Sequence, residues 1–127
     1  MSFPTDKKDN YTLIRTEVEK LDGTVSPALK SELVVINAKG EKNIIVDLSN
    51  TRYCDSSGLS AILVGNRLCK SANGTFIICG LQPSVNKLVS ISQLDSILKI
   101  TPTLSEAVDL LFLEEIERNL GGEDEEK

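Results

Sequence analysis

The sequence predicts a single α/β domain: a mixed, mostly parallel sheet of about four to five strands, with about four helices packed mainly on one side. The chain has 127 residues, enough for one domain with a real core and too few for two. Short β-branched and aliphatic runs alternate with helical apolar patterns along it. Such alternation is typical of parallel strands joined by right-handed helical crossovers.

Four runs have the composition of strands, at residues 11–18, 43–48, 75–79 and 97–100. The run at 43–48 has consecutive apolar residues, which predicts a central strand covered on both faces. A further short edge strand is expected near the end of the polar segment 1–10.

Two helices are predicted between the first three long strands. Ser26 is expected as the N-cap of the first and Pro27 as its first residue, with Gly40 at its end. The second covers residues 57–70 and is closed by Asn73. The residues expected to face inward are Leu29, Leu33, Ile36, Ala61, Ile62, Gly65, Leu68 and Cys69.

Two more helices are predicted in the last third of the chain. Pro83 opens a short one, and Thr103 with Glu106 forms a capping box before the last. Their expected inward-facing residues are Val85, Leu88, Val89, Leu104, Ala107, Val108 and Leu111.

Acidic charge is concentrated at the C-terminus. The net charge is −5, and the last fourteen residues hold seven acidic and two basic side chains, which leaves twelve of each sign before them. An acidic chain lacks the basic footprint that nucleic acid requires, so we expect no direct nucleic-acid binding. We expect a polar segment at 1–10, the folded domain at 11–113, and an acidic extension at 114–127 that is partly helical and then disordered.

The cysteines indicate a reducing compartment. Cys54, Cys69 and Cys79 form no CxxC pair, and without histidine they do not compose a metal site. No charged start followed by an apolar run marks a signal peptide, and no apolar stretch is long enough to cross a bilayer. We therefore expect a cytoplasmic protein with no metal, no cofactor and no membrane association.

An enzymatic function is not expected, because the usual catalytic parts are missing. The chain contains no histidine, no G-x-S-x-G elbow, and no glycine-rich nucleotide loop. Asp47 and Asp55 alone are weak support for acid–base chemistry. We therefore assign no catalytic residue.

The most informative motif is Asp55-Ser56-Ser57-Gly58, directly after a predicted strand and at the start of a helix. One interpretation is an ordinary helix start, since Asp and Ser are favoured N-caps. The other is a regulatory site, because a phosphoryl group is accommodated where unpaired N–H groups and the positive end of the helix dipole meet solvent. Both interpretations remain open on the residues alone.

Leu59 and Leu63 follow this motif one helical turn apart. They fall on a flank away from the predicted core stripe, so one interpretation is an exposed docking patch beside the serines. The alternative is that a neighbouring element covers them.

The order of several motifs resembles a STAS domain, and in particular a bacterial anti-sigma-factor antagonist. The most specific is the Asp55-Ser56-Ser57-Gly58-Leu59 run after Val46-Asp47-Leu48. Asp22, Ser26-Pro27, Asn73-Gly74, Pro83-x-Val85, Leu88 and Glu106-Ala107 also occur in the family's order, so the resemblance spans residues 12–113.

The resemblance implies that Ser57 is the phosphoryl acceptor, with Ser56 as second choice. It also implies that Asp22 contributes to the phosphorylation and binding surface, together with Asp55, Gly58 and the leucines that follow. In the implied cycle, the unphosphorylated protein binds an anti-sigma factor that is a serine kinase and so frees the sigma factor. The kinase uses its own ATP to modify Ser57 and so ends binding, and a metal-dependent serine phosphatase restores the hydroxyl.

A second hypothesis belongs to another functional class. The chain would be a STAS scaffold or adaptor of a transporter or signalling complex, with Ser57 acting only as a helix cap.

Overall fold

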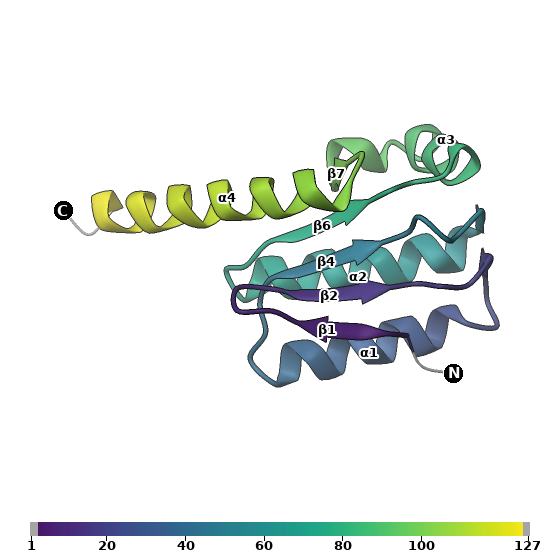
Figure 1. Cartoon of the computed structure of the whole chain (residues 1–127), viewed down its shortest axis with the longest axis horizontal. Helices are drawn as coiled ribbons and strands as arrows, with labels where there is room; N and C mark the ends of the chain where they lie inside the picture. Colours follow the sequence, from purple (N-terminus) through teal and green to yellow (C-terminus); the bar gives the residue numbers. More distant parts are fainter. Residues whose placement is uncertain (1–2, 126–127) are drawn as a thin grey trace.

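A five-stranded sheet forms the centre of the protein (Figure 1). The computed structural model describes residues 3–125, with side-chain burial described for residues 3–120. The strands are β1 (Thr5–Lys7), β2 (Thr12–Arg15), β4 (Ile44–Asp47), β6 (Phe76–Cys79) and β7 (Lys99–Thr101), in the order β1-β2-β4-β6-β7. Within residues 3–125, only the β1–β2 pairing of this sheet is antiparallel. The predicted fold class is confirmed, including an edge strand within residues 1–10.

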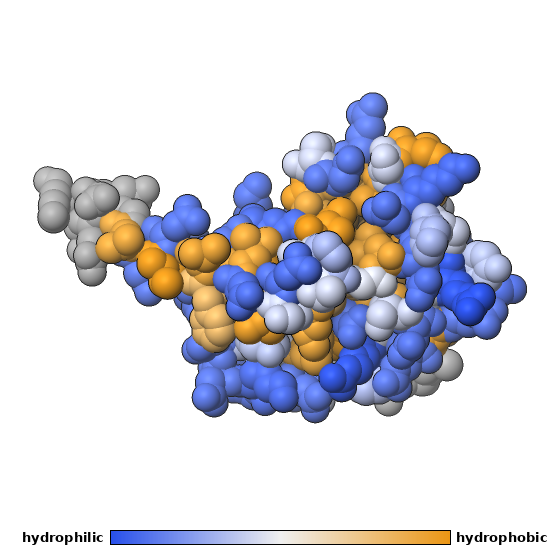
Figure 2. All heavy atoms as spheres, turned by 45° about the horizontal axis from the view of Figure 1, so that its top comes forward, coloured by the Kyte–Doolittle hydropathy of each residue, from blue (hydrophilic) through white to orange (hydrophobic). Residues whose placement is uncertain are grey.

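Helices cover both faces of this sheet, so the expectation that they pack mainly on one side is wrong. In Figure 1, α1 (Ser26–Ala38) and α2 (Ser56–Ser71) lie behind it, whereas α4 (Leu104–Glu125) packs on β4, β6 and β7. A shorter helix, α3 (Pro83–Ile91), precedes a 3₁₀ turn, η1 (Leu94–Ser96). The end of α4 projects beyond the sheet, and Figure 2 shows apolar residues on the surface of this projecting part. None of the described helices is long and apolar enough to cross a membrane.

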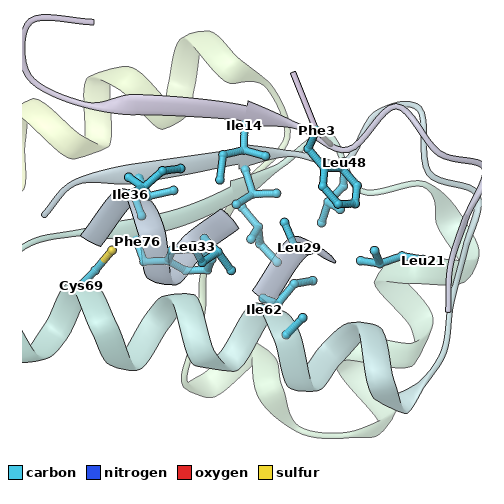
Figure 3. Close-up of a cluster of buried hydrophobic side chains, with 14 of the residues drawn as sticks. Phe3, Ile14, Leu21, Leu29, Leu33, Ile36, Leu48, Ile62, Cys69 and Phe76 are labelled. Atoms are coloured by element: carbon cyan, nitrogen blue, oxygen red, sulfur yellow. The ribbon is translucent and has the colours of Figure 1, made fainter. Parts of the chain in front are cut away.

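The central strand β4 contributes side chains to two hydrophobic cores, one on each face of the sheet. Ile44, Ile45 and Val46 are each fully buried. Because side chains alternate along a strand, Ile44 and Val46 join the larger core beneath α1 and α2. Ile45 joins a smaller core beneath α4, together with Leu111. Figure 3 shows side chains of the larger core pointing toward one another from the sheet and the helices.

Two predicted boundaries are wrong. The N-cap of α1 is Val25, and Ser26 is already helical and buried. The last strand begins at Lys99, later than predicted, because the backbone first forms η1 and Ile97 is the C-cap of that turn. Ile97 is 56% exposed, so its aliphatic side chain gave a misleading strand signal.

A second, two-stranded parallel sheet joins two loops at the carboxyl ends of β2 and β4. It pairs β3 (Lys20–Leu21) with β5 (Tyr53–Cys54). The Glu19 carbonyl accepts hydrogen bonds from the amides of Arg52 and Tyr53 as well. The sequence interpretation missed this ladder, which holds the loop before α1 against the loop before α2.

The predicted capping residues do begin α4. The Glu106 amide donates to Thr103 Oγ1, and Thr103 Oγ1 lies 3.1 Å from Glu106 Oε1. The helix then continues without a break to Glu125, through the segment expected to be partly helical and then disordered. The last two residues, 126–127, lie outside the described part of the chain.

Candidate functional site

The start of α2 is organised by one carboxylate. Asp55 is the N-cap, and its Oδ1 accepts hydrogen bonds from the amides of Ser57 at 2.9 Å and Gly58 at 3.1 Å. The same oxygen accepts the Ser57 hydroxyl at 2.5 Å. Asp55 therefore satisfies amides that the helix itself leaves unpaired. The capping role that the sequence interpretation left open for Ser57 is filled by Asp55.

The Ser57 hydroxyl lies at the junction of two helices. It is partly exposed, and its oxygen is 3.2 Å from the hydroxyl oxygen of Ser26 in the first turn of α1. Ser56, the first residue of α2, is exposed. Both serines suggested by the sequence are thus at the surface, but only Ser57 is held in a network of side-chain hydrogen bonds with Asp55 and Ser26.

Gly58 allows the backbone of β3 to approach α2 closely. A Cβ atom at this position would lie 2.5 Å from the Leu21 carbonyl oxygen and 2.6 Å from Cys54 Sγ. Real side chains do not tolerate such distances, so a glycine is required here. Its role is to let the two loops and the helix pack together, which brings Asp22 and Ser57 into one region.

Asp22 organises the turn into α1. Its Oδ1 accepts hydrogen bonds from the amide and the hydroxyl of Thr24, at 3.0 Å and 2.6 Å, and its carbonyl accepts the Ser26 amide at 2.8 Å. The next residue, Gly23, lies beside the serine: a Cβ there would be 3.9 Å from Ser57 Oγ. The structure therefore brings the predicted Asp22 loop next to the predicted serine.

The site carries two carboxylates that stay ionised. The Ser57 hydroxyl, followed by the Gly58 amide, lowers the pKa of Asp55. The Thr24 hydroxyl and amide lower the pKa of Asp22, while the negative charge of Asp55 acts in the opposite direction. Hydrogen bonds to the charged form explain both shifts. Two negative charges therefore lie in the loops beside Ser57, with Lys20 lining the same hollow.

Cys54 is not a competing nucleophile at this site. Burial, together with the charge of Asp55, raises the pKa of its thiol to about 11. Since the thiolate is the reactive form, this thiol is unreactive near neutral pH. Burial raises the pKa of Cys69 and of Cys79 to about 12 in the same way.

A shallow hollow of about 120 Å³ adjoins the two carboxylates. It is lined by Lys20, Leu21, Asp22, Tyr53, Cys54 and Asp55. Its volume suits a side chain of a partner better than a drug-sized ligand. Within the residues that the structure describes, no three Cys, Asp or Glu side chains form a group able to hold a metal ion.

Of the two alternatives for Leu59 and Leu63, the structure supports coverage by neighbouring elements, and the exposed leucine patch is wrong. Leu59 is only 5% exposed, and Leu63 is half-buried against the larger core. The helical pattern of α2 could not reveal this, because α2 has neighbours on more than one side: α1, β5 and β6 all contact it. Its buried arc is therefore wider than one stripe.

The sequence analysis did not identify two residues that belong to the site, Ser26 and Tyr53. Ser26 was expected to be a helix cap, and its contact with Ser57 depends on how α1 meets α2. Tyr53 is 52% exposed beside the two carboxylates. An aromatic residue in a loop directly before the Asp55 motif is a signal that could have identified it, since tyrosine is enriched at protein interfaces.

A sequence profile of the STAS domain matches residues 2–107 of the chain. The chain belongs to the STAS domain family. This STAS domain is also 31% identical, over 84 residues, to BtrV of Bordetella bronchiseptica, a candidate anti-sigma factor antagonist. That match covers 63% of this STAS domain protein and 72% of BtrV.

Solved structures share the same fold. A candidate anti-sigma factor antagonist from Thermotoga maritima has a TM-score of 0.80 to this STAS domain at 26% identity, covering 86% of this chain and 93% of that one. The phosphorylated form of the Bacillus cell fate determinant SpoIIAA has a TM-score of 0.66 at 22% identity, covering 85% and 97%. The unphosphorylated form of SpoIIAA is similar to the same extent, with a TM-score of 0.67.

Proposed function

We propose that this STAS domain is an anti-sigma-factor antagonist whose binding is controlled by phosphorylation of Ser57. The unphosphorylated form binds an anti-sigma factor that is a serine kinase, and sigma factor is released. The kinase transfers the γ-phosphoryl group of ATP to Ser57 Oγ, the hydroxyl proton is lost, and ADP leaves. A metal-dependent serine phosphatase hydrolyses the phosphoester, and the domain needs no cofactor or catalytic residue of its own.

The observation that carries this proposal is the environment of Ser57. Its hydroxyl is partly exposed at the start of α2, and its proton is directed toward Asp55 Oδ1 at 2.5 Å. A kinase can reach such a hydroxyl without unfolding the domain. SpoIIAA, which shares this fold, has been solved in phosphorylated and unphosphorylated forms, which supports a modification that the fold tolerates.

The same geometry accounts for the loss of binding. A phosphoserine carries about −1.5 to −2 charges at neutral pH. At Ser57 this charge would add to those of Asp55 and Asp22, and it would compete with Asp55 for the amides of α2. The helix dipole favours the phosphate by about 0.3–1 kcal/mol at an exposed helix start, so the fold is kept. The change is therefore in what the surface presents to the kinase.

We place the binding surface on the loops around Ser57. Asp22, Asp55, Ser56 and Gly58 belong to it, with Tyr53 at its edge. Leu59 and the half-buried Leu63 contribute by supporting the first turn of α2 from within, because neither forms an exposed patch.

Intact mass of the protein purified from its own host tests this proposal. A fraction should carry one phosphoryl group, which phosphatase treatment removes. The group should be absent from Ser57→Ala and retained in the matched control Ser56→Ala. A pull-down from the same lysate should recover a kinase with the dephosphorylated protein and not with the phosphorylated one.

Two outcomes would contradict the proposal. Phosphorylation that persists in Ser57→Ala would place the acceptor elsewhere, and a partner that binds both forms equally would favour the scaffold hypothesis.

A further inference from the structure

The second half of α4 exposes an apolar face to solvent. Its members, here called the α4 stripe, are Phe112 at 41% exposed, Leu113 at 56%, Ile116 at 56% and Leu120 at 57%. They fall on one side of the helix because their spacing follows i, i+4 and i, i+3 steps. With a rise of about 1.5 Å per residue, the stripe is about 12 Å long, which is two helical turns of contact surface.

Polar residues on the opposite side of α4 bond to the body of the domain and so determine which side of the helix faces solvent. Glu115 Oε2 accepts a hydrogen bond from Asn43 Nδ2 at 3.1 Å, and Glu114 Oε1 accepts one from Thr75 Oγ1 at 3.2 Å. Arg118 Nη2 donates to the same Thr75 oxygen. A solvated amphipathic helix would place its charges outward and its apolar residues inward. In the first half of α4 apolar residues such as Leu111 do face inward, but around Glu114, Glu115 and Arg118 polar residues contact the body while the α4 stripe faces water.

The stripe is remote from Ser57. Asn43 and Thr75 precede β4 and β6, so α4 is attached at the amino ends of these strands. The Ser57 site follows β4, at the carboxyl ends. In Figure 1 the far end of α4 and the start of α2 lie at opposite ends of the molecule, and Figure 2 shows the apolar residues along the projecting helix.

The charges along α4 are almost all acidic. The helix contains eight acidic residues and one basic residue, Arg118. Arg118 is already bonded to Thr75, and the nearby Lys99 pairs with Glu114 at 3.4 Å. Asp109 and Glu117, both exposed, flank the stripe. At the Phe112 end, Lys7 and Lys8 line a hollow with the stripe, and Lys7 is paired with Glu41 at 2.8 Å. An apolar stripe beside Asp109 and Glu117 is complementary to a surface that combines apolar and basic residues.

We propose that the α4 stripe binds a basic amphipathic helical segment of a partner protein, with apolar residues in the stripe and Lys or Arg beside Asp109 and Glu117. Helices that lay an apolar face on a complementary surface are a common recognition mode. A second copy of this chain fits less well, because pairing two acidic helices is unfavourable. An anionic membrane is disfavoured for the same electrostatic reason.

A synthetic peptide probe tests the proposal on the full-length protein. The probe is a fluorescein-labelled helix with Leu at i, i+3, i+4 and i+7 and Lys on both flanks. Its controls carry the same leucines with Glu in place of Lys, or the same residues in scrambled order. Fluorescence anisotropy should detect binding of the Lys peptide only, and binding should weaken as salt is raised.

Variants assign the binding to the stripe. Ile116→Gln with Leu120→Gln should weaken Lys-peptide binding by about tenfold or more, because two apolar contacts are lost. The matched control is Val34→Gln with Val35→Gln on α1, whose side chains are 47% and 48% exposed. It should bind like the unmodified protein, and circular dichroism should show the same helix content in all three. Ser57→Asp should also leave this binding unchanged, because the stripe is at the other end of the domain.

Each of the other occupants gives a different result, and any of these results would overturn the proposal. If neither peptide binds, or if the Lys and Glu peptides bind equally well, a basic partner is excluded. Self-association that strengthens with salt in sedimentation experiments, and is lost in the stripe variant, assigns the stripe to a second copy. Co-sedimentation with anionic phosphatidylserine vesicles assigns it to a membrane.

Discussion

The hydroxyl oxygens of Ser57 and Ser26 lie 3.2 Å apart and join the first turn of α2 to the first turn of α1. Ser26 is only 2% exposed, whereas Ser57 is partly exposed. The acceptor proposed for phosphorylation is therefore held from inside by a buried hydroxyl and from outside by Asp55. Its orientation depends on both helices and on the cap.

We expect Ser26→Ala to lower the free energy of unfolding by about 0.5–1.5 kcal/mol, the usual net contribution of a hydrogen bond. Urea titration measures it. The matched control is Ser60→Ala in α2, whose exposed side chain should change stability by no more than about 0.5 kcal/mol. Equal effects of the two substitutions would argue that the Ser26–Ser57 contact contributes nothing.

Gly58→Ala should destabilise the domain by about 1–3 kcal/mol, because the added Cβ overpacks the Leu21 carbonyl and Cys54 Sγ. The control is Gly23→Ala, where the Cβ would meet only Ser57 Oγ at an ordinary 3.9 Å. Chemical denaturation should separate the two variants clearly. An unchanged midpoint for Gly58→Ala would mean that β3 and α2 are free to move apart.

Replacement of the cap should affect stability according to hydrogen-bonding capacity. Asp55→Ala removes the acceptor of two amides and should lower the thermal midpoint by a few degrees, whereas Asp55→Asn should keep most of the cap. Differential scanning calorimetry checks the order. If Asn were as damaging as Ala, the negative charge rather than the hydrogen bonds would be the main contribution.

Acid should weaken the domain through Asp55 and Asp22. Their folded-state pKa values are lowered, so both favour folding above the unfolded value, about 3.9 for Asp. This contribution is lost as the pH falls below about 4 through the folded-state pKa. Thermal midpoints measured between about pH 2 and 7 should show the decline. In the double variant Asp22→Asn with Asp55→Asn, the thermal midpoint should decline less steeply as the pH falls. An identical slope would contradict the assignment of the decline to Asp22 and Asp55.

Phosphorylation should change the role of Asp55. In the unmodified protein Asp55 caps α2, but a phosphate on Ser57 would repel its carboxylate and seek the same amides. Asp55→Asn should therefore be tolerated better, relative to its parent, in the phosphorylated protein than in the unphosphorylated one. A thermodynamic cycle of the four species measures this coupling. Additive effects would show that the phosphate points away from the cap.

The main sheet and its helices could be predicted because the spacing of apolar residues along one helix or strand indicates which of its side chains are buried. Leu29, Leu33 and Ile36 are all buried as their spacing predicted. Where burial depends on a neighbouring element, the prediction was wrong, as for Leu59, which a single-helix pattern places outside the core.

The candidate site shows the same division. The Asp55-Ser57 run predicted a helix start, which is confirmed, because the hydrogen bonds that form it are local in sequence. That Ser57 is modified stays a prediction. The contact between Ser57 and Ser26, and the β3–β5 ladder, join residues about thirty positions apart. Neither has a local pattern, so only the packed structure reveals them.

The ladder between β3 and β5 is two residues long and separate from the five-stranded sheet. Leu21 of this ladder is nevertheless fully buried in the larger core, and Ser57 is bonded to both Asp55 and Ser26, so the backbone around the serine is anchored to the domain. A kinase or phosphatase would therefore meet this serine on a backbone that the domain already holds in place. Repeated rounds of modification would then leave the rest of the domain folded.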